Sequence, residues 1–115
     1  MVILFQNKKL EKCFNNEKAL IKQYGPRQAE KIKKRMVQLD AVKTLADLRK
    51  LPQIRAHELT GNLKGKVSID LVHPYRLLIE PAMKNCPLME DGGLDWARVT
   101  QITILEVRDT HDKKR

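Results

Sequence analysis

Aromatic residues and cysteines are scarce in this sequence of 115 residues. One Trp, two Tyr and two Phe make up 4% of the chain, so a core must be built mainly from Leu, Ile and Val. The two cysteines, Cys13 and Cys86, stand far apart, which favours buried free thiols over the disulfide framework of a small secreted protein. No apolar run approaches the roughly 20 residues of a membrane span, and the opening MVILFQNKK is too short for a signal peptide. We therefore expect a soluble, cytoplasmic protein with one domain over residues 1–115.

Motifs that would fix a chemistry by themselves are also missing. The cysteines and histidines lack the paired spacing of a zinc site, and no GxSxG, GxGxxG or paired acidic motif occurs. The stretch TGNLKGK, residues 60–66, has glycines and lysines but not the Ser or Thr that follows GK in a P-loop. It is interpreted either as a basic hairpin loop or as a contact to phosphate. We expect no metal and no cofactor.

Positive charge is concentrated in the first part of the chain. Residues 1–66 hold 16 Lys or Arg against 6 Asp or Glu, whereas residues 67–115 hold 7 against 8. The net charge of +9 therefore comes entirely from the first part. Such a surface suits a polyanionic partner, because neutralising phosphates releases their counterions. Nucleic acid is the first candidate, and a solvated helical face that only aids solubility is the alternative.

Helical patterns occupy the first half of the sequence. Residues 8–25 carry apolar side chains at near-helical spacing until Gly25 and Pro26 end the segment. Residues 26–43 give the strongest pattern, with basic side chains around an apolar stripe of Ala29, Ile32, Met36, Leu39 and Val42. A short capped turn follows, in which Thr44 is the N-cap and Asp47 stands three residues on.

Strand patterns occupy the second half. Residues 67–71 alternate apolar and polar side chains, and residues 75–80 do so again after a turn at His73-Pro74, which predicts a hairpin. Residues 101–111 form the last strand, whose apolar side chains on both parities indicate cover on both faces. Residues 2–5 are either a further strand or packed apolar chain. The order predicts an α+β fold, with two N-terminal helices packed on a small, mainly antiparallel sheet whose other face is open.

The turn-rich stretch of residues 81–99, called the excursion below, separates the last two strands. It contains the prolines Pro81 and Pro87 and the glycines Gly92 and Gly93. Its larger apolar side chains indicate that it packs down on the domain rather than floating free; they are Met83, Met89, Leu94 and Trp96. We interpret it as cover for a sheet edge, with contact to a partner protein as the alternative.

Four polar residues suit the cleavage of RNA. Such cleavage needs a base for the 2′-hydroxyl, an acid for the 5′-oxygen and a fixed cation for the developing charge. Histidine suits the proton transfers because its pKa lies near neutrality, and arginine suits the phosphate because it stays charged and binds as a fork. The candidates stand on different predicted strands, so only the fold can bring them together; they are His57, Arg76, Asp109 and His111. His73, in the predicted turn, is interpreted as structural.

The sequence resembles the HigB-like killer toxins of the bacterial RelE/ParE superfamily. The stretch KKRMVQLDAVKTLADLRKLP is similar to the family's R-x-x-x-L-D-A-x-x-S-L-x-D-L segment. It is followed by likenesses to H-x-L-K-G-x-x-K-G, W-S-I, Y-R-I and D-Y-H, in that order. The positions that carry them are His57, Leu59, Gly61, Lys64, Gly65, Ser68, Ile69, Tyr75, Arg76, Asp109 and His111. The chain departs from the pattern at Thr60, where Lys is common, at Thr110, where Tyr is usual, and in the length of the excursion.

The resemblance implies a ribosome-dependent mRNA endonuclease with a RelE/ParE-like fold. It implies that His57, Asp109 and His111 transfer protons and that Arg76 stabilises the phosphorane-like charge, without a metal. The expected RNA contacts are Lys64, Lys66, Lys33, Lys34 and Arg35. The implied partners are the small ribosomal subunit, its mRNA and a HigA-like helix-turn-helix antitoxin, through which alone the protein would reach operator DNA.

Two other functions remain open at the level of the sequence. The superfamily includes toxins that poison gyrase on the same scaffold, although the two histidines and Arg76 argue against that activity here. A regulatory protein that only binds its partner or operator DNA is the third possibility. It ranks last because the helices contain no helix-turn-helix signature.

Overall fold

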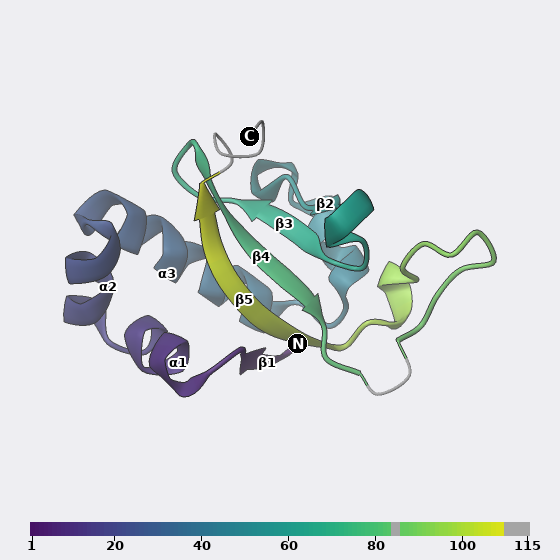
Figure 1. The fold of residues 1–115 in the computed structure, drawn as a ribbon, viewed down its shortest axis with the longest axis horizontal. Coiled ribbons are helices and arrows are strands. Elements are labelled where there is room, and N and C mark those ends of the chain that lie inside the picture. The colour runs from purple at the N-terminus through teal and green to yellow at the C-terminus, as the bar shows by residue number, and fades with distance from the viewer. Residues whose placement is uncertain (84–85, 110–115) are drawn as a thin grey trace.

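The computed structural model describes residues 1–83 and 86–109 (Figure 1). The helices are α1 (Lys8–Phe14), α2 (Glu17–Tyr24) and α3 (Pro26–Ala41). The strands are β1 (Val2–Phe5), β2 (His57–Glu58), β3 (Val67–Asp70), β4 (Tyr75–Pro81) and β5 (Gln101–Asp109). Short 3₁₀ turns join them, namely η1 (Leu45–Lys50), η2 (Pro52–Ile54), η3 (Gly61–Leu63) and η4 (Trp96–Arg98). The predicted α+β class is confirmed, and no helix of the described residues is long and apolar enough to cross a membrane.

The five strands form one sheet in the order β1-β5-β4-β3-β2. β1 runs parallel to β5, and the other neighbours are antiparallel, so the sheet is mainly antiparallel as predicted. The predicted hairpin is the pair β3–β4, joined by the turn at His73-Pro74. Residues 2–5 are a true strand at one edge, and the two-residue β2 forms the other edge.

The last strand contains a bulge that corrects the expectation of cover on both faces. Leu78 of β4 pairs with Glu106, whereas the next residue, Ile79, pairs with Ile104. The extra residue, Leu105, reverses the alternation of β5 at that point. Ile104 before the bulge and Val107 after it consequently both join the core, although their parities differ. The mixed apolar pattern therefore reflects a change of register rather than a strand buried on two sides, and Glu106 is exposed.

The N-terminal helical segment is divided into two short helices at Asn16, and each helix begins after an asparagine cap. The backbone N–H of Leu10 donates to Asn7 Oδ1 at 2.8 Å at the start of α1. The N–H of Ala19 donates in the same way to Asn16 Oδ1 at 3.0 Å at the start of α2. An asparagine side chain that caps a new helix favours an extended backbone at its own position, which ends the preceding helix. One expected helix over residues 8–25 is therefore two.

Helix α3 packs on the rear face of the sheet in the view of Figure 1 and supplies much of the core. Its buried side chains follow helical spacing, but Arg35 belongs to that stripe and not to the basic faces, which corrects the sequence-based assignment. Positions 28, 32, 35 and 39 are four, three and four residues apart, so they share one side of the helix. The strands contribute apolar side chains to the same core, and the largest fully buried ones are Leu20, Ile32, Leu39, Leu45, Leu48, Ile54, Ile69, Leu77, Ile79, Ile102, Ile104 and Val67.

The excursion packs against the domain in part. Leu94 and Trp96 are buried as predicted, and Val99 is buried too. Met89 is 56% exposed, so the prediction that it packs down is wrong. Figure 1 shows the middle of the excursion as a loop that projects from the body, and a bridge between Leu88 and Leu94 closes that loop. Cys86 is a free thiol, as predicted, but it is exposed rather than buried.

Candidate active site

Polar and charged side chains gather on the face of the sheet that the helices leave open. Residues directly opposite each other in an antiparallel pair lie on the same face. One such row across three strands is Asp70, Arg76 and Arg108. In the adjacent row, His57 of β2 lies opposite Ser68 of β3. Since Ser68 and Asp70 are two residues apart on β3, His57 shares this face with the two arginines.

Arg76 is held across strand β3 by several polar groups. Its Nη1 lies 2.6 Å from Asp70 Oδ1, and its Nη2 donates to the carbonyl oxygens of Arg55 at 2.7 Å and Ser68 at 3.3 Å. Ser68 is the residue opposite His57, so the Arg76 guanidinium reaches the row in which the histidine lies. These contacts fix a cation in one position without relying on a ligand.

Burial makes this fixed cation less well solvated than an ordinary arginine. Desolvation lowers the pKa of Arg76, the negative charge of Asp70 raises it in part, and the positive charge of Arg55 lowers it further. Its buried Nε has no acceptor among the described residues. A guanidinium that the protein holds in one position can stabilise the charge of an oxyanion without reorganising.

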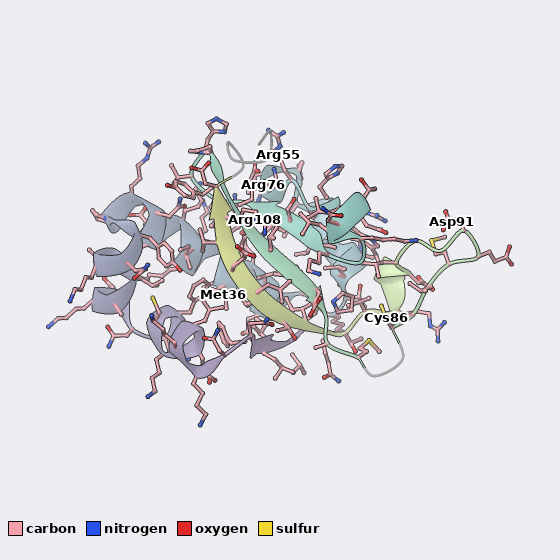
Figure 2. All side chains as sticks on the ribbon, viewed as in Figure 1. Met36, Arg55, Arg76, Cys86, Asp91 and Arg108 are labelled. Carbon is pink, nitrogen blue, oxygen red and sulfur yellow. The ribbon has the colours of Figure 1, made fainter. Side chains whose placement is uncertain are left out.

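Arg55 and Arg108 add two more guanidinium groups to the same region. Arg55 adopts a left-handed backbone conformation, with φ of 51°, directly after η2. Its Nε lies 3.4 Å from Asp70 Oδ2, and its side chain is 72% exposed. Arg108 Nη2 lies 3.3 Å from Glu106 Oε2 on the same strand. Figure 2 shows Arg55, Arg76 and Arg108 close together over the upper half of the sheet. We call these three residues the arginine cluster.

Two cavities hollow this face on either side of the arginine cluster. The larger, of about 590 Å³, lies between the β2–η3 segment and strand β5, where His57 and Arg108 form opposite parts of its lining. The smaller, of about 250 Å³, is lined by Arg55, Asp70 and Arg76 together with residues of the His73-Pro74 turn. The histidine is exposed at the first cavity. An imidazole and guanidinium groups therefore line openings on one face.

The structure does not bring Asp109 to this face. Asp109 lies opposite Tyr75, one residue along from the pair of Arg76 and Arg108, so its side chain belongs to the face of Leu77 and Val107. The bulge causes this placement, because it reverses the alternation of β5 before Asp109 is reached. Thr110 and His111 lie outside the described residues.

The lysines expected to contact RNA have different surroundings. Lys33 pairs with Glu17 at 2.8 Å, and that hydrogen bond and charge lower the pKa of the glutamate. Lys66 lies 3.8 Å from Glu80 on the open face of the sheet. Lys64 is exposed after η3, and Lys34 is exposed on α3, where it lines a cleft with Lys31.

Arg35 differs from the lysines because it is a structural residue. Its side chain is buried, with 3% of the residue exposed, and it donates to Asp70 O at 2.7 Å, Gln38 Oε1 at 2.9 Å and Gln53 O at 3.1 Å. Burial lowers its pKa, and the charge of Asp70 partly offsets that effect. Arg35 therefore joins α3 to the end of β3 and to η2, beneath the arginine cluster. The prediction that it contacts RNA is wrong in this arrangement, because its guanidinium is enclosed.

Sequence reasoning missed Arg55 and Arg108 as members of the site. Arg108 stands two residues from Glu106, and this spacing puts both on one face of a strand. Which face that is depends on the bulge, for which the sequence carries no glycine or other marker. Arg55 comes just before the matched motif at His57, and its ion pair with Asp70 depends on the sheet order.

Comparison with known proteins adds one result to this geometry. The model of a family described as the RelE-like toxin HigB of type II toxin–antitoxin systems matches residues 3–88, about three quarters of the chain. The match includes His57 and Arg76 and ends within the excursion, so Arg108 and Asp109 lie beyond it. No curated protein and no solved structure matches the chain significantly. A type II toxin is paired with a protein antitoxin, so the family implies such a partner. The chain belongs to the HigB-like family of RelE-like toxins of type II toxin–antitoxin systems.

Proposed function

We propose that this HigB-like toxin is an endoribonuclease that cuts mRNA on the ribosome and thereby blocks translation. The observation that carries the proposal is the shared open face of His57, Arg76 and Arg108. An imidazole and fixed guanidinium groups on one face supply one proton-transfer group and the fixed cation that cleavage of a phosphodiester by its own 2′-hydroxyl needs.

The proposed reaction transfers two protons. A base removes the 2′-hydroxyl proton, and the 2′-oxygen attacks the adjacent phosphorus, which forms a 2′,3′-cyclic phosphate. An acid protonates the 5′-oxygen as its bond to phosphorus breaks, which leaves a 5′-hydroxyl. His57 takes one of these roles. His111 is proposed, on the family resemblance alone, to supply the other, because the side chain of Asp109 belongs to the opposite face of the sheet.

The arginine cluster stabilises the charge that builds on the non-bridging oxygens during this step. Asp70 orients Arg76 and Arg55 through ion pairs of 2.6 and 3.4 Å. Guanidinium groups held in place before the substrate binds need no reorganisation when charge develops. No metal and no cofactor takes part in the proposed mechanism, because the arginines supply the cation.

The proposed setting is the decoding site of the small ribosomal subunit, in the cytoplasm. Lys64 and Lys66, near the open face, and Lys34 and Lys33 on α3 are proposed to contact mRNA and ribosomal RNA through phosphates. The proposed antitoxin is HigA-like and carries a helix-turn-helix, so the complex binds operator DNA through the antitoxin and not through this chain.

The test is to express the protein without its antitoxin and to map mRNA 5′-ends during the arrest of growth. The proposal expects new ends with a 5′-hydroxyl that disappear when translation is blocked. His57→Ala should remove them while the protein remains folded. DNA damage without new ends would instead support a gyrase poison, and the absence of arrest would support a regulatory protein that only binds its partner. Either result would overturn the proposal.

A further inference from the structure

His57 stands on a strand that is too short to hold itself in place. β2 has two residues, and its ladder consists of the pairs His57 with Ser68 and Glu58 with Val67. One further hydrogen bond, from the N–H of Leu59 to the carbonyl oxygen of Lys66 at 2.9 Å, extends the contact to β3. β2 is also the edge of the sheet, so no strand of the described residues pairs with its outer side.

The excursion contacts the outer side of β2 through one carboxylate. Glu58 accepts the indole Nε1–H of Trp96 on Oε1 at 2.8 Å and the backbone N–H of Leu94 on Oε2 at 3.1 Å. Successive residues of a strand point to opposite faces, so Glu58 reaches the excursion while His57 stays on the open face. Both carboxylate oxygens of Glu58 are therefore bonded to a segment 36 to 38 residues further along the chain.

The donors that Glu58 accepts are themselves fixed. Trp96 is 3% exposed, and the guanidinium carbon of Arg49 lies 3.7 Å from the centre of its ring. At the end of η4, the carbonyl oxygen of Val99 accepts the N–H of Leu45 at 2.9 Å, which ties the excursion to η1. The indole is thus stacked against Arg49 and otherwise enclosed, so it cannot move without disturbing buried contacts.

These contacts give the excursion a role in positioning the candidate catalytic group. We propose that Trp96 and Glu58 are positioning residues for His57, and that the excursion anchors β2 through the Glu58 side chain. This inference rests on the proposed function for its catalytic consequence, but not for its structural one. Loss of the contact should let β2 move, and a displacement of about 1 Å at a catalytic group can reduce a rate by about 100-fold.

The donors to Glu58 lie outside the part of the chain that carries the family match, whereas His57 and Glu58 lie within it. Residues 3–88 match the family, whereas Leu94 and Trp96 lie beyond them. The excursion was the feature in which the sequence departs from the tight turn expected between the last two strands. The contact with Glu58 explains why a longer connection is useful in this chain.

The decisive variant is Trp96→Phe, which removes the N–H donor and keeps an aromatic ring over which Arg49 can stack. Glu58→Gln is a second variant that leaves the buried ring untouched, and it decides the question if Trp96→Phe does not fold. Met89→Leu is the matched control, because Met89 lies in the same excursion and is 56% exposed. The first measurement is nuclear magnetic resonance, which records amide hydrogen exchange and the ring signals of His57.

We expect the Leu59 amide to exchange at least about 10-fold faster in both variants, with amides of the β4–β5 pair unchanged. The His57 ring signals should shift in the variants and not in Met89→Leu. The second measurement is cleavage of ribosome-bound mRNA, in which kcat should fall about 10-fold while KM stays within about twofold. Unchanged Leu59 exchange and unchanged His57 signals would overturn the inference. If the parent cuts no mRNA, the proposed function fails, and the resonance data still decide whether the excursion positions β2.

Discussion

Replacing Arg35 with methionine tests whether this residue belongs to the core beneath the arginine cluster or to an RNA-binding surface. Methionine has a similar length and no charge, so it fills much of the space and removes the donors. In the structure, Arg35 is enclosed and donates to Asp70 O, Gln38 Oε1 and Gln53 O. The substitution therefore leaves two backbone carbonyl groups and one amide oxygen without their donors.

The magnitude follows from these three bonds and from the cost of burying a charge. A hydrogen bond to a charged group contributes about 1.5–3 kcal/mol. The desolvation that lowers the pKa of Arg35 offsets part of that gain. The three lost hydrogen bonds outweigh the desolvation that the substitution removes. We therefore expect the free energy of unfolding to fall by about 3 kcal/mol in Arg35→Met. In a domain of this size, such a loss lowers Tm by about 10 °C.

The assay is thermal and urea unfolding of the purified protein, with Lys34→Met as the matched control. Lys34 is the preceding residue of α3 and is exposed, so its replacement should change the free energy of unfolding by less than about 0.5 kcal/mol. If Arg35→Met unfolds like the parent and loses affinity for RNA, the reasoning from burial is refuted and the guanidinium acts at the surface.

Three further outcomes follow from the same contacts. Arg108→Ala should reduce mRNA cleavage by at least about 10-fold, because the Arg108 guanidinium lines the cavity of His57. Tm should not change, because the ion pair of Arg108 with Glu106 is partly exposed. Cleavage equal to that of the parent would exclude Arg108 from the site. Lys34→Gln should lower the slope of log affinity for RNA against log salt concentration by about 0.7. Lys33→Gln should lower that slope by less, because Lys33 is paired with Glu17. Equal effects of the two variants in a salt titration would contradict the pairing. Hydrogen bonds from the N–H groups of Thr44 and Lys43 lower the pKa of Asp47 below its ordinary value of 3.8, so its contribution to stability should be complete above that pH and lost as the pH falls through the folded-state pKa. The Tm difference between the parent and Asp47→Asn should accordingly disappear in acid, and a difference that persists at about pH 2 would show that the carboxylate charge is not its source.

Much of the fold was accessible from the sequence because local patterns agreed with it. The spacing in α3, the capped turn at Thr44 and the β3–β4 hairpin each follow from residues that are near one another in the chain. The placement of Arg35 was not accessible in the same way. A positive charge on a buried stripe is stable only where carbonyl groups from other segments accept its hydrogen bonds, and the sequence does not show where those segments meet.

The candidate site was predictable in part for a different reason. His57 and Arg76 stand in short motifs that resemble a family, and the structure places both on the open face. Arg108, and not Asp109, shares the face of Arg76, because the bulge at Leu105 shifts every later side chain of β5 to the other face. A single extra residue in a strand leaves little trace in composition, so alternation alone assigns the wrong neighbour to the arginines.

The parallel pair of β1 and β5 has a consequence for the time at which the protein can become harmful. Val2 pairs with Gln101 and Phe5 with Ile104, so the first strand waits for partners that are made about 100 residues later. Strand β5 also delivers Arg108 beside Arg76. A nascent chain that has not yet released this strand from the translating ribosome lacks both the closed sheet and the completed row of guanidinium groups. The order of synthesis thus delays the assembly of this row of guanidinium groups until the last strand of the sheet has been made.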